Sequence, residues 1–195
     1  AGGACRRCGE GRTEGGGGPE VVTGGYVACR PELFCKGGPW KVVTGGDTSG
    51  VRDDSGLNVP EPEVAVVVTA FGEILGYTIC NDVSSRSIEG ENPLYLPQAK
   101  MYARSCAIHH LVRVFDNDFD PNALAITGEI IRGGETIWHA EASTSQLNRG
   151  FDELVGWLFR CNEFPQGAVF STGTCLVPEM HHTLQEGDTA RAAIG

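Results

Sequence analysis

The clearest hydrophobic pattern in the chain is a pair of apolar runs that predicts a β-hairpin. Residues 61 to 69 and 74 to 80 are rich in valine, isoleucine, tyrosine and threonine, which suit a pleated, half-buried surface. The short link between the runs contains Gly72, a residue typical of hairpin turns. If the turn is centred just before Gly72, Glu61 lies opposite Asp82 in the predicted sheet.

A second hairpin is predicted further along the chain. Residues 123 to 144 contain two apolar runs joined by the segment Arg-Gly-Gly-Glu at positions 132 to 135. We expect Trp138, in the second run, to be a core or interface residue. Residues 188 to 194 predict one more strand.

Residues 145 to 161 predict the one clear helix. Its apolar residues recur at helical spacing: Phe151, Leu154, Val155, Leu158 and Phe159. Ser145 or Asn148 is the candidate cap. We therefore expect a mostly antiparallel α+β fold, in a chain of 195 residues that is long enough to form a sizeable core.

Three acidic residues gather at one end of the first predicted hairpin. Side chains alternate along a strand, so Glu61 and Glu63 face the same side, and the register brings Asp82 beside them. Like charges facing each other destabilise a sheet, and oxygen ligands favour a hard cation, Mg²⁺ first and then Mn²⁺ or Ca²⁺. The alternative is a solvated strand end with ordinary surface carboxylates, and a slip of the turn would move Asp82 to the other face.

Four ordered motifs resemble the fumarylacetoacetate hydrolase family, and most of all its branch of 2-keto-3-deoxy sugar acid dehydratases: EPEVAVVV, GYTICNDVSSR, EGENPLYLPQAKMY and SCAI. The resemblance implies a mixed β-roll over residues 26 to 195, with the site at one end of its sheets. It also implies that Glu61, Glu63 and Asp82 hold a divalent metal and that Lys100 lies in the active site. The segment RPELFCKGGPWKVV extends the resemblance, and its Lys36 either lines the site or is a solvated lysine.

The segment FSTGTCLVP, at residues 170 to 178, contains a further candidate for substrate binding. In the family, a Thr-Gly-Thr turn at this place offers hydroxyl and backbone donors to the substrate, which points to Thr172, Gly173 and Thr174. Glycine lets a backbone approach a ligand closely. The alternative is an ordinary strand turn.

The segment from 83 to 98 is expected to form an irregular loop over the site. Arg86, Glu89 and Glu91 are candidates for substrate contacts or lid positions, with Arg86 a substrate ligand and Glu91 a catalytic residue. The alternative is that these residues form surface ion pairs, which contribute little.

The resemblance implies a small 2-oxo acid as substrate, held by Mg²⁺ through its carboxylate and keto oxygens. Loss of a proton from the neighbouring carbon and expulsion of a β-hydroxyl would give dehydration of a 2-keto-3-deoxy pentonate, with Lys100 as charge stabiliser or proton carrier. One alternative is a carbon–carbon hydrolase of the acylpyruvate or fumarylacetoacetate type. Another is a non-catalytic relic, because the chain departs from the family at Cys35, Ser87, His109 and His110.

Composition narrows the possible partners. The net charge of −10 argues against nucleic acid and against anionic membrane surfaces. No apolar run reaches the roughly 18 to 20 residues that span a bilayer, and no basic-then-apolar leader is seen, so we expect a cytoplasmic protein with reduced cysteines. The resemblance implies a homodimer, with Trp40 or Trp138 at its interface.

The first 25 residues are rich in glycine, and we expect them to be flexible and of doubtful authenticity. Cys5 and Cys8 lack a matched second pair, so we interpret them as two unrelated thiols rather than zinc ligands. The chain starts at Ala1 and ends inside a predicted strand, and we therefore expect a catalytic domain truncated at both ends.

Overall fold

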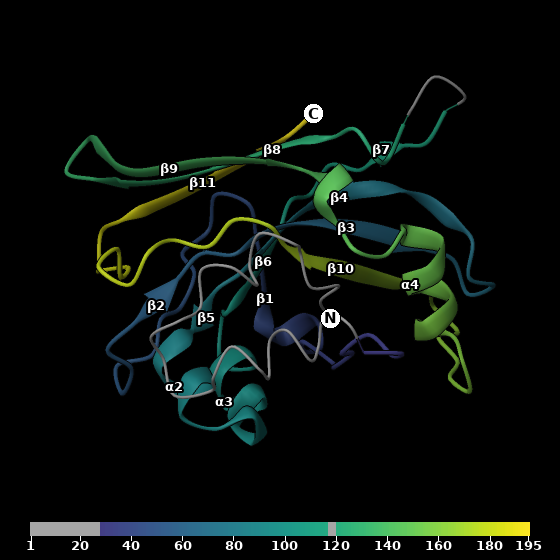
Figure 1. Cartoon of the computed structure of the whole chain (residues 1–195), viewed down its shortest axis with the longest axis horizontal. Coiled ribbons are helices and arrows are strands. Elements are labelled where there is room, and N and C mark those ends of the chain that lie inside the picture. Colours follow the sequence, from purple (N-terminus) through teal and green to yellow (C-terminus); the bar gives the residue numbers. More distant parts are fainter. Residues whose placement is uncertain (1–27, 117–119) are drawn as a thin grey trace.

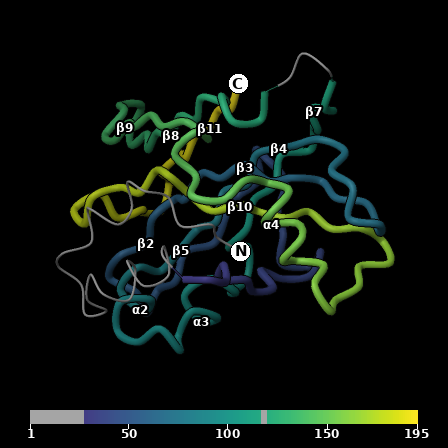
Figure 2. The backbone as a smooth tube through the Cα atoms, turned by 45° about the vertical axis from the view of Figure 1, so that its right-hand side comes forward, coloured from purple at the N-terminus to yellow at the C-terminus, as the bar shows by residue number. Residues whose placement is uncertain are grey.

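The computed structural model describes residues 28–116 and 120–195, and residues 1 to 25 therefore lie outside the described part. Figure 1 shows one sheet lying over a larger sheet, with short helices at one end and a longer helix at the other. The tube view in Figure 2 gives the same arrangement. In chain order the elements are η1 (Pro39–Lys41), β1 (Val42–Thr44), β2 (Asn58–Val59), β3 (Pro62–Val68), β4 (Ile74–Asp82), β5 (Ser84–Ser85), α2 (Arg86–Glu91), η2 (Pro93–Tyr95), α3 (Leu96–Lys100), β6 (Cys106–Ile108), β7 (Arg113–Val114), β8 (Ala125–Arg132), β9 (Glu135–Ser143), η3 (Thr144–Gln146), α4 (Phe151–Leu158), β10 (Ala168–Thr174) and β11 (Thr189–Ile194).

The sheets are mostly antiparallel, which confirms the predicted fold class. The larger sheet has the order β1-β6-β4-β3-β10, with β7 also paired to β4, and only β1 and β6 run parallel. The second sheet has the order β11-β8-β9, and β2 pairs with β5 in a small third sheet. No helix in the described ranges has the length and apolar character needed to cross a membrane.

The core lies between the two larger sheets and is closed at one end by α4 (Figure 1). Its buried members from β3, β8 and α4 are Val64, Val66, Val68, Ile126, Ile130, Leu154 and Val155. Trp138 of β9 is 6% exposed and belongs to this core, as the sequence predicted. Because side chains alternate along β3, the even-numbered valines fill the core while Glu61, Glu63 and Ala65 point to the opposite face.

The predicted register of the first hairpin is confirmed. Pro62 pairs with Asn81 and Glu63 with Cys80, and the backbone N–H of Asp82 donates to the Glu61 carbonyl over 3.0 Å. A one-residue irregularity between Val67 and Val68 lies near the turn and leaves the acidic end in register. The acidic residues therefore meet where the spacing placed them.

The second hairpin and the last strand are also confirmed. Gly133 and Gly134 have φ values of 59° and 90°, the left-handed conformations that suit a tight two-residue turn between β8 and β9. Strand β11 pairs with β8 along its whole length.

The predicted helix is shorter than the sequence indicated. Residues Thr144–Gln146 form a separate 3₁₀ turn capped by Ser143, and Leu147 is extended with ψ of 137°. Helix α4 therefore begins at Phe151, with Gly150 as its N-cap, rather than at 145. The expectation that Ser145 or Asn148 caps the helix was wrong, because an extended segment separates the two elements.

The expectation of an irregular loop over residues 83 to 98 was also wrong. This segment forms β5, α2, η2 and α3, which are short because glycine and proline interrupt them. Pro93 and Pro97 lie in the first turns of η2 and α3, where a missing N–H costs nothing and the fixed φ suits a helix. Lys100 is the last residue of helix α3, so the helix fixes the position of the Lys100 backbone.

Candidate metal centre

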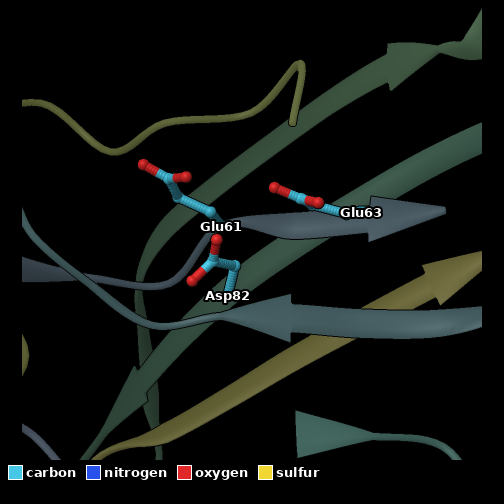
Figure 3. Close-up of side chains that lie close together, drawn as sticks. All are labelled: Glu61, Glu63 and Asp82. Carbon is cyan, nitrogen blue, oxygen red and sulfur yellow. The ribbon is translucent and has the colours of Figure 1, made fainter. Parts of the chain in front are cut away.

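Three buried carboxylates meet at the adjoining ends of β3 and β4. Figure 3 shows Glu63 on β3, Glu61 directly before this strand and Asp82 at the end of the neighbouring β4, with the three side chains close together. One oxygen from each lies within 4.8 Å of the others, and each residue is 3% exposed. The solvated-surface alternative is therefore excluded for this cluster.

Glu63 is held firmly from β10. Its Oε2 accepts a hydrogen bond from the hydroxyl of Ser171 and a second, of 3.1 Å, from the backbone N–H of Gly173. Burial, followed by the nearby negative charge of Asp82, raises the pKa of Glu63 from 4.5 to about 7. Glu63 is thus the carboxylate of the cluster whose ionisation is opposed by its surroundings.

Lys100 places a positive charge beside the other two carboxylates, those of Glu61 and Asp82. Its ammonium donates to Glu61 Oε2 and to Ser84 Oγ, each over 2.6 Å, and lies 3.7 Å from Asp82 Oδ2. Burial opposes the charged form, but the carboxylates of Asp82 and Glu61 outweigh it and raise the pKa of Lys100 well above its ordinary range. Lys100 therefore carries a fixed positive charge in the metal-free site.

Arg86, at the start of α2, lies on the other side of Glu61. Its Nη1 donates to Glu61 Oε1 over 3.1 Å, and its Nε lies 3.5 Å from Glu89 Oε2. Glu61 thus has one oxygen near Arg86 and the other near Lys100. The alternative that Arg86 belongs to a surface ion pair does not fit, because its side chain is only 14% exposed.

Lys36 is a member of the site that the sequence left undecided. Its ammonium contacts the carboxylate of Asp82 and donates to the backbone carbonyl of Lys100, and its side chain is 13% exposed. The solvated reading of Lys36 was wrong. Only the family resemblance of its segment pointed to it, because no local pattern connects residue 36 with residue 82.

The remaining predicted site residues form no ion pair with the three carboxylates in the described part of the chain. The hydroxyls of Thr172 and Thr174 donate to the carbonyls of Val64 and Pro62, each over 2.8 Å. Glu91 is exposed at the end of α2 and, within the described ranges, forms no hydrogen bond or ion pair with the carboxylate cluster. The acidic residue of α2 that faces the site is Glu89.

The charges of the site fit a divalent cation. Four carboxylates face three basic side chains, a formal charge of −1, and the groups are Glu61, Glu63, Asp82, Glu89, Lys36, Arg86 and Lys100. Carboxylate oxygens are the ligands that Mg²⁺ prefers in proteins. Adding a divalent cation would change the formal charge to +1, which suits an anionic substrate.

Comparison with known proteins places these features in a family. The protein-family model described as "Fumarylacetoacetate (FAA) hydrolase C-terminal" matches residues 38–195 of this chain. A Haloferax volcanii protein named "Probable 2-keto-3-deoxyxylonate dehydratase" is 51% identical over 170 residues, which are 87% of this chain and 58% of that protein. The "2-dehydro-3-deoxy-D-arabinonate dehydratase" of Saccharolobus solfataricus is 41% identical over 169 residues, which are 87% of this chain and 57% of that protein.

A solved structure with a related fold has ligands bound. It is described as "2-keto-3-deoxy-D-arabinonate dehydratase complexed with magnesium and 2,5-dioxopentanoate", and it matches with a TM-score of 0.86 and 40% identity. The match covers 89% of this chain and 62% of that one. The chain described here therefore spans somewhat over half the length of the curated relatives that it matches.

Proposed function

Because the chain belongs to the fumarylacetoacetate hydrolase family, we propose that it forms the catalytic part of a Mg²⁺-dependent lyase that dehydrates a 2-keto-3-deoxy sugar acid of the pentonate type. One observation carries this proposal: three buried carboxylates and a buried lysine meet at the end of β3 and β4. The names of the two curated relatives support the reaction type.

Glu61, Glu63 and Asp82 would hold the cation. Mg²⁺ is the first choice, supported by the relative that binds it, and Mn²⁺ or Ca²⁺ could take its place at the same oxygens. When bound, the cation supplies a Lewis acid for the carboxylate and keto oxygens of a 2-oxo acid.

The basic side chains of the site would then act on the substrate. Dehydration removes a proton from C3 and breaks the bond between C4 and its hydroxyl, which leaves as water. The Lys100 ammonium lies beside the carboxylates and would stabilise the negative charge that C3 deprotonation places on the substrate. Arg86 and Lys36 keep this side of the cluster positive.

Other assignments stay predictions. Thr172, Gly173 and Thr174 are proposed to line the substrate position, because Gly173 and Thr174 lie beside Glu63 at the end of β10 and Thr172 directly precedes them. A catalytic role for Glu91 would require α2 to present it to the site, since its side chain is exposed. Residues 26 to 195 remain the proposed extent of the catalytic domain.

A carbon–carbon hydrolase of the acylpyruvate or fumarylacetoacetate type is the alternative from the same family. Such an enzyme needs a histidine or glutamate that activates water. Within the ranges that the structure describes, no histidine bonds to the carboxylate cluster, and Glu89, which pairs with Arg86, is the glutamate that such an enzyme could use.

The test is an assay of the purified chain with a 2-keto-3-deoxypentonate and, separately, with an acylpyruvate, each with Mg²⁺ and with a chelator. We expect Mg²⁺-dependent loss of water from the first substrate, followed by proton NMR, and no turnover by Glu61→Gln. Cleavage of the acylpyruvate alone would favour the hydrolase. Metal binding without turnover of either substrate would favour the relic.

We further propose a homodimer in the cytoplasm. Trp138 is buried in the core, so Trp40, which is 82% exposed, is the tryptophan that remains available for an interface. A reducing compartment would keep the six cysteines of the described ranges as thiols. Light scattering coupled to size-exclusion chromatography measures the mass directly, and a monomer at micromolar concentration would contradict the dimer.

A further inference from the structure

Two donors from β10 meet on a single oxygen of Glu63. The Ser171 hydroxyl and the Gly173 N–H both donate to Oε2, and both hydrogen bonds reach this carboxylate from one segment of chain. In the described part of the chain, these are the two hydrogen bonds that Glu63 accepts, and Oε1 receives neither of them. The carboxylate is thus held through one oxygen, beside the carboxylates of Glu61 and Asp82.

A break in the strand register creates this arrangement. Ser171 pairs with Ala65, but Thr174 pairs with Glu63, so an extra residue is inserted in β10 between these pairs. Such a β-bulge changes the direction of neighbouring groups and occurs often beside active sites. Gly173 has φ of 96°, a left-handed value that strongly favours glycine. The bulge turns its N–H towards the Glu63 side chain instead of the ladder.

We propose that Ser171, together with the Gly173 N–H, is a positioning element for the metal ligand Glu63. The bonds to Oε2 fix the carboxylate plane and present Oε1 to the cation. Hydrogen bonds that orient a ligand from behind typically change metal affinity by roughly 10- to 100-fold when removed. This inference rests on the proposed metal site and assigns Ser171 a role that does not require contact with substrate.

The experiment measures the affinity for Mg²⁺ alone, from the rise in unfolding temperature as the metal is titrated into the purified chain. Ser171→Ala removes the hydroxyl donor and is expected to weaken Mg²⁺ binding by roughly 10- to 100-fold. Ser171→Thr keeps a hydroxyl and should restore affinity close to that of the wild type. Ser171→Cys retains the size of serine but donates weakly, and it should resemble Ser171→Ala.

Thr144→Val is the matched control. Thr144 is 3% exposed, and its hydroxyl accepts a 3.0 Å hydrogen bond from the Leu124 N–H at the η3 turn, which takes no part in the acidic cluster. This variant should lose stability without losing Mg²⁺ affinity. At saturating Mg²⁺ the turnover of Ser171→Ala should approach that of the wild type, because the variant changes metal affinity and not the chemical groups of the site.

The outcomes separate this inference from the proposed function. Unchanged Mg²⁺ affinity in Ser171→Ala and Ser171→Cys, with a wild type that binds Mg²⁺, would overturn the positioning role alone. A wild type that gains no stability from Mg²⁺ would overturn the metal site itself. If Ser171→Ala does not fold, the comparison of Ser171→Cys with Ser171→Thr decides the question.

Discussion

Glu63 gives the sharpest prediction for the metal-free protein, because its ionisation is opposed by its surroundings. Burial and then the charge of Asp82 raise its pKa from 4.5 to about 7. The folded protein therefore holds a proton that the unfolded chain releases between these two values. Stability contributed by this proton is fully present below pH 4.5 and is lost as the pH rises through about 7.

The size of the loss follows from the two pKa values. A change in pKa from 4.5 to about 7 corresponds to roughly 3 kcal/mol of unfolding free energy, at about 1.36 kcal/mol for each pKa unit. Glu63→Gln removes the titration but keeps a side-chain oxygen that can accept from Ser171 and Gly173. In the presence of a chelator, this variant should gain about 2.5 kcal/mol relative to the wild type between pH 5 and pH 8.

Urea unfolding of both proteins at several pH values measures this difference, because all other titrating groups are shared and cancel. Added Mg²⁺ should stabilise the wild type at pH 8 and leave Glu63→Gln almost unchanged. Parallel stability curves for the two proteins from pH 5 to pH 8 would refute the reasoning. They would mean that Glu63 ionises as an ordinary exposed glutamate does.

Three further predictions follow from the same contacts. Mg²⁺ affinity should fall about tenfold for each pH unit below about 7, because the cation displaces the Glu63 proton. Calorimetric titration at pH 6 and pH 7 measures this fall, and the same affinity at both pH values would contradict the prediction. Lys100→Met should destabilise the metal-free protein by about 3–5 kcal/mol, because it leaves buried charges on Glu61 and Asp82, and a loss no greater than for an exposed lysine would contradict the buried ion pairs. Gly167→Ala should destabilise the protein by about 1–3 kcal/mol, because Gly167 has φ of 74° and a Cβ would lie 2.4 Å from the Val68 carbonyl oxygen. Gly156→Ala, on the exposed side of α4, should instead stabilise the protein by about 0.5–1 kcal/mol. Equal unfolding midpoints for the two variants would refute this prediction.

The parts of the fold that were predictable are those with local causes. Alternation along β3 and the glycine at its turn are contained in a short segment, and together they determine the register of the hairpin. The glycine pair at 133 and 134 does the same for the second hairpin. Because the register decides which side chains of neighbouring strands lie together, the acidic cluster was predictable as well.

The parts that were missed depend on contacts between distant segments. Lys36 approaches Asp82 only after η1 and β1 have packed beside β6, and its ion pair leaves no local pattern. Ser171 acts through a bulge, and one extra residue in a strand is not visible in a sequence of suitable β-formers. The helix start was misplaced because Leu147 takes an extended conformation that its helical propensity does not indicate.

The same alternation that builds the core also concentrates charge on the other side of β3. Val64, Val66 and Val68 fill the space between the sheets, and Glu61 and Glu63, which precede them at odd-numbered positions, are thereby directed to the opposite face. Repulsion among the carboxylates is therefore retained in the folded state rather than relieved by local rearrangement. A bound cation would remove this repulsion. The stability of the metal-free protein and its affinity for metal therefore depend on the same carboxylates. Glu63→Gln should therefore stabilise the metal-free protein while it abolishes metal binding, whereas neutralising Glu61 or Asp82 should destabilise it, because their buried basic partners would be left unpaired.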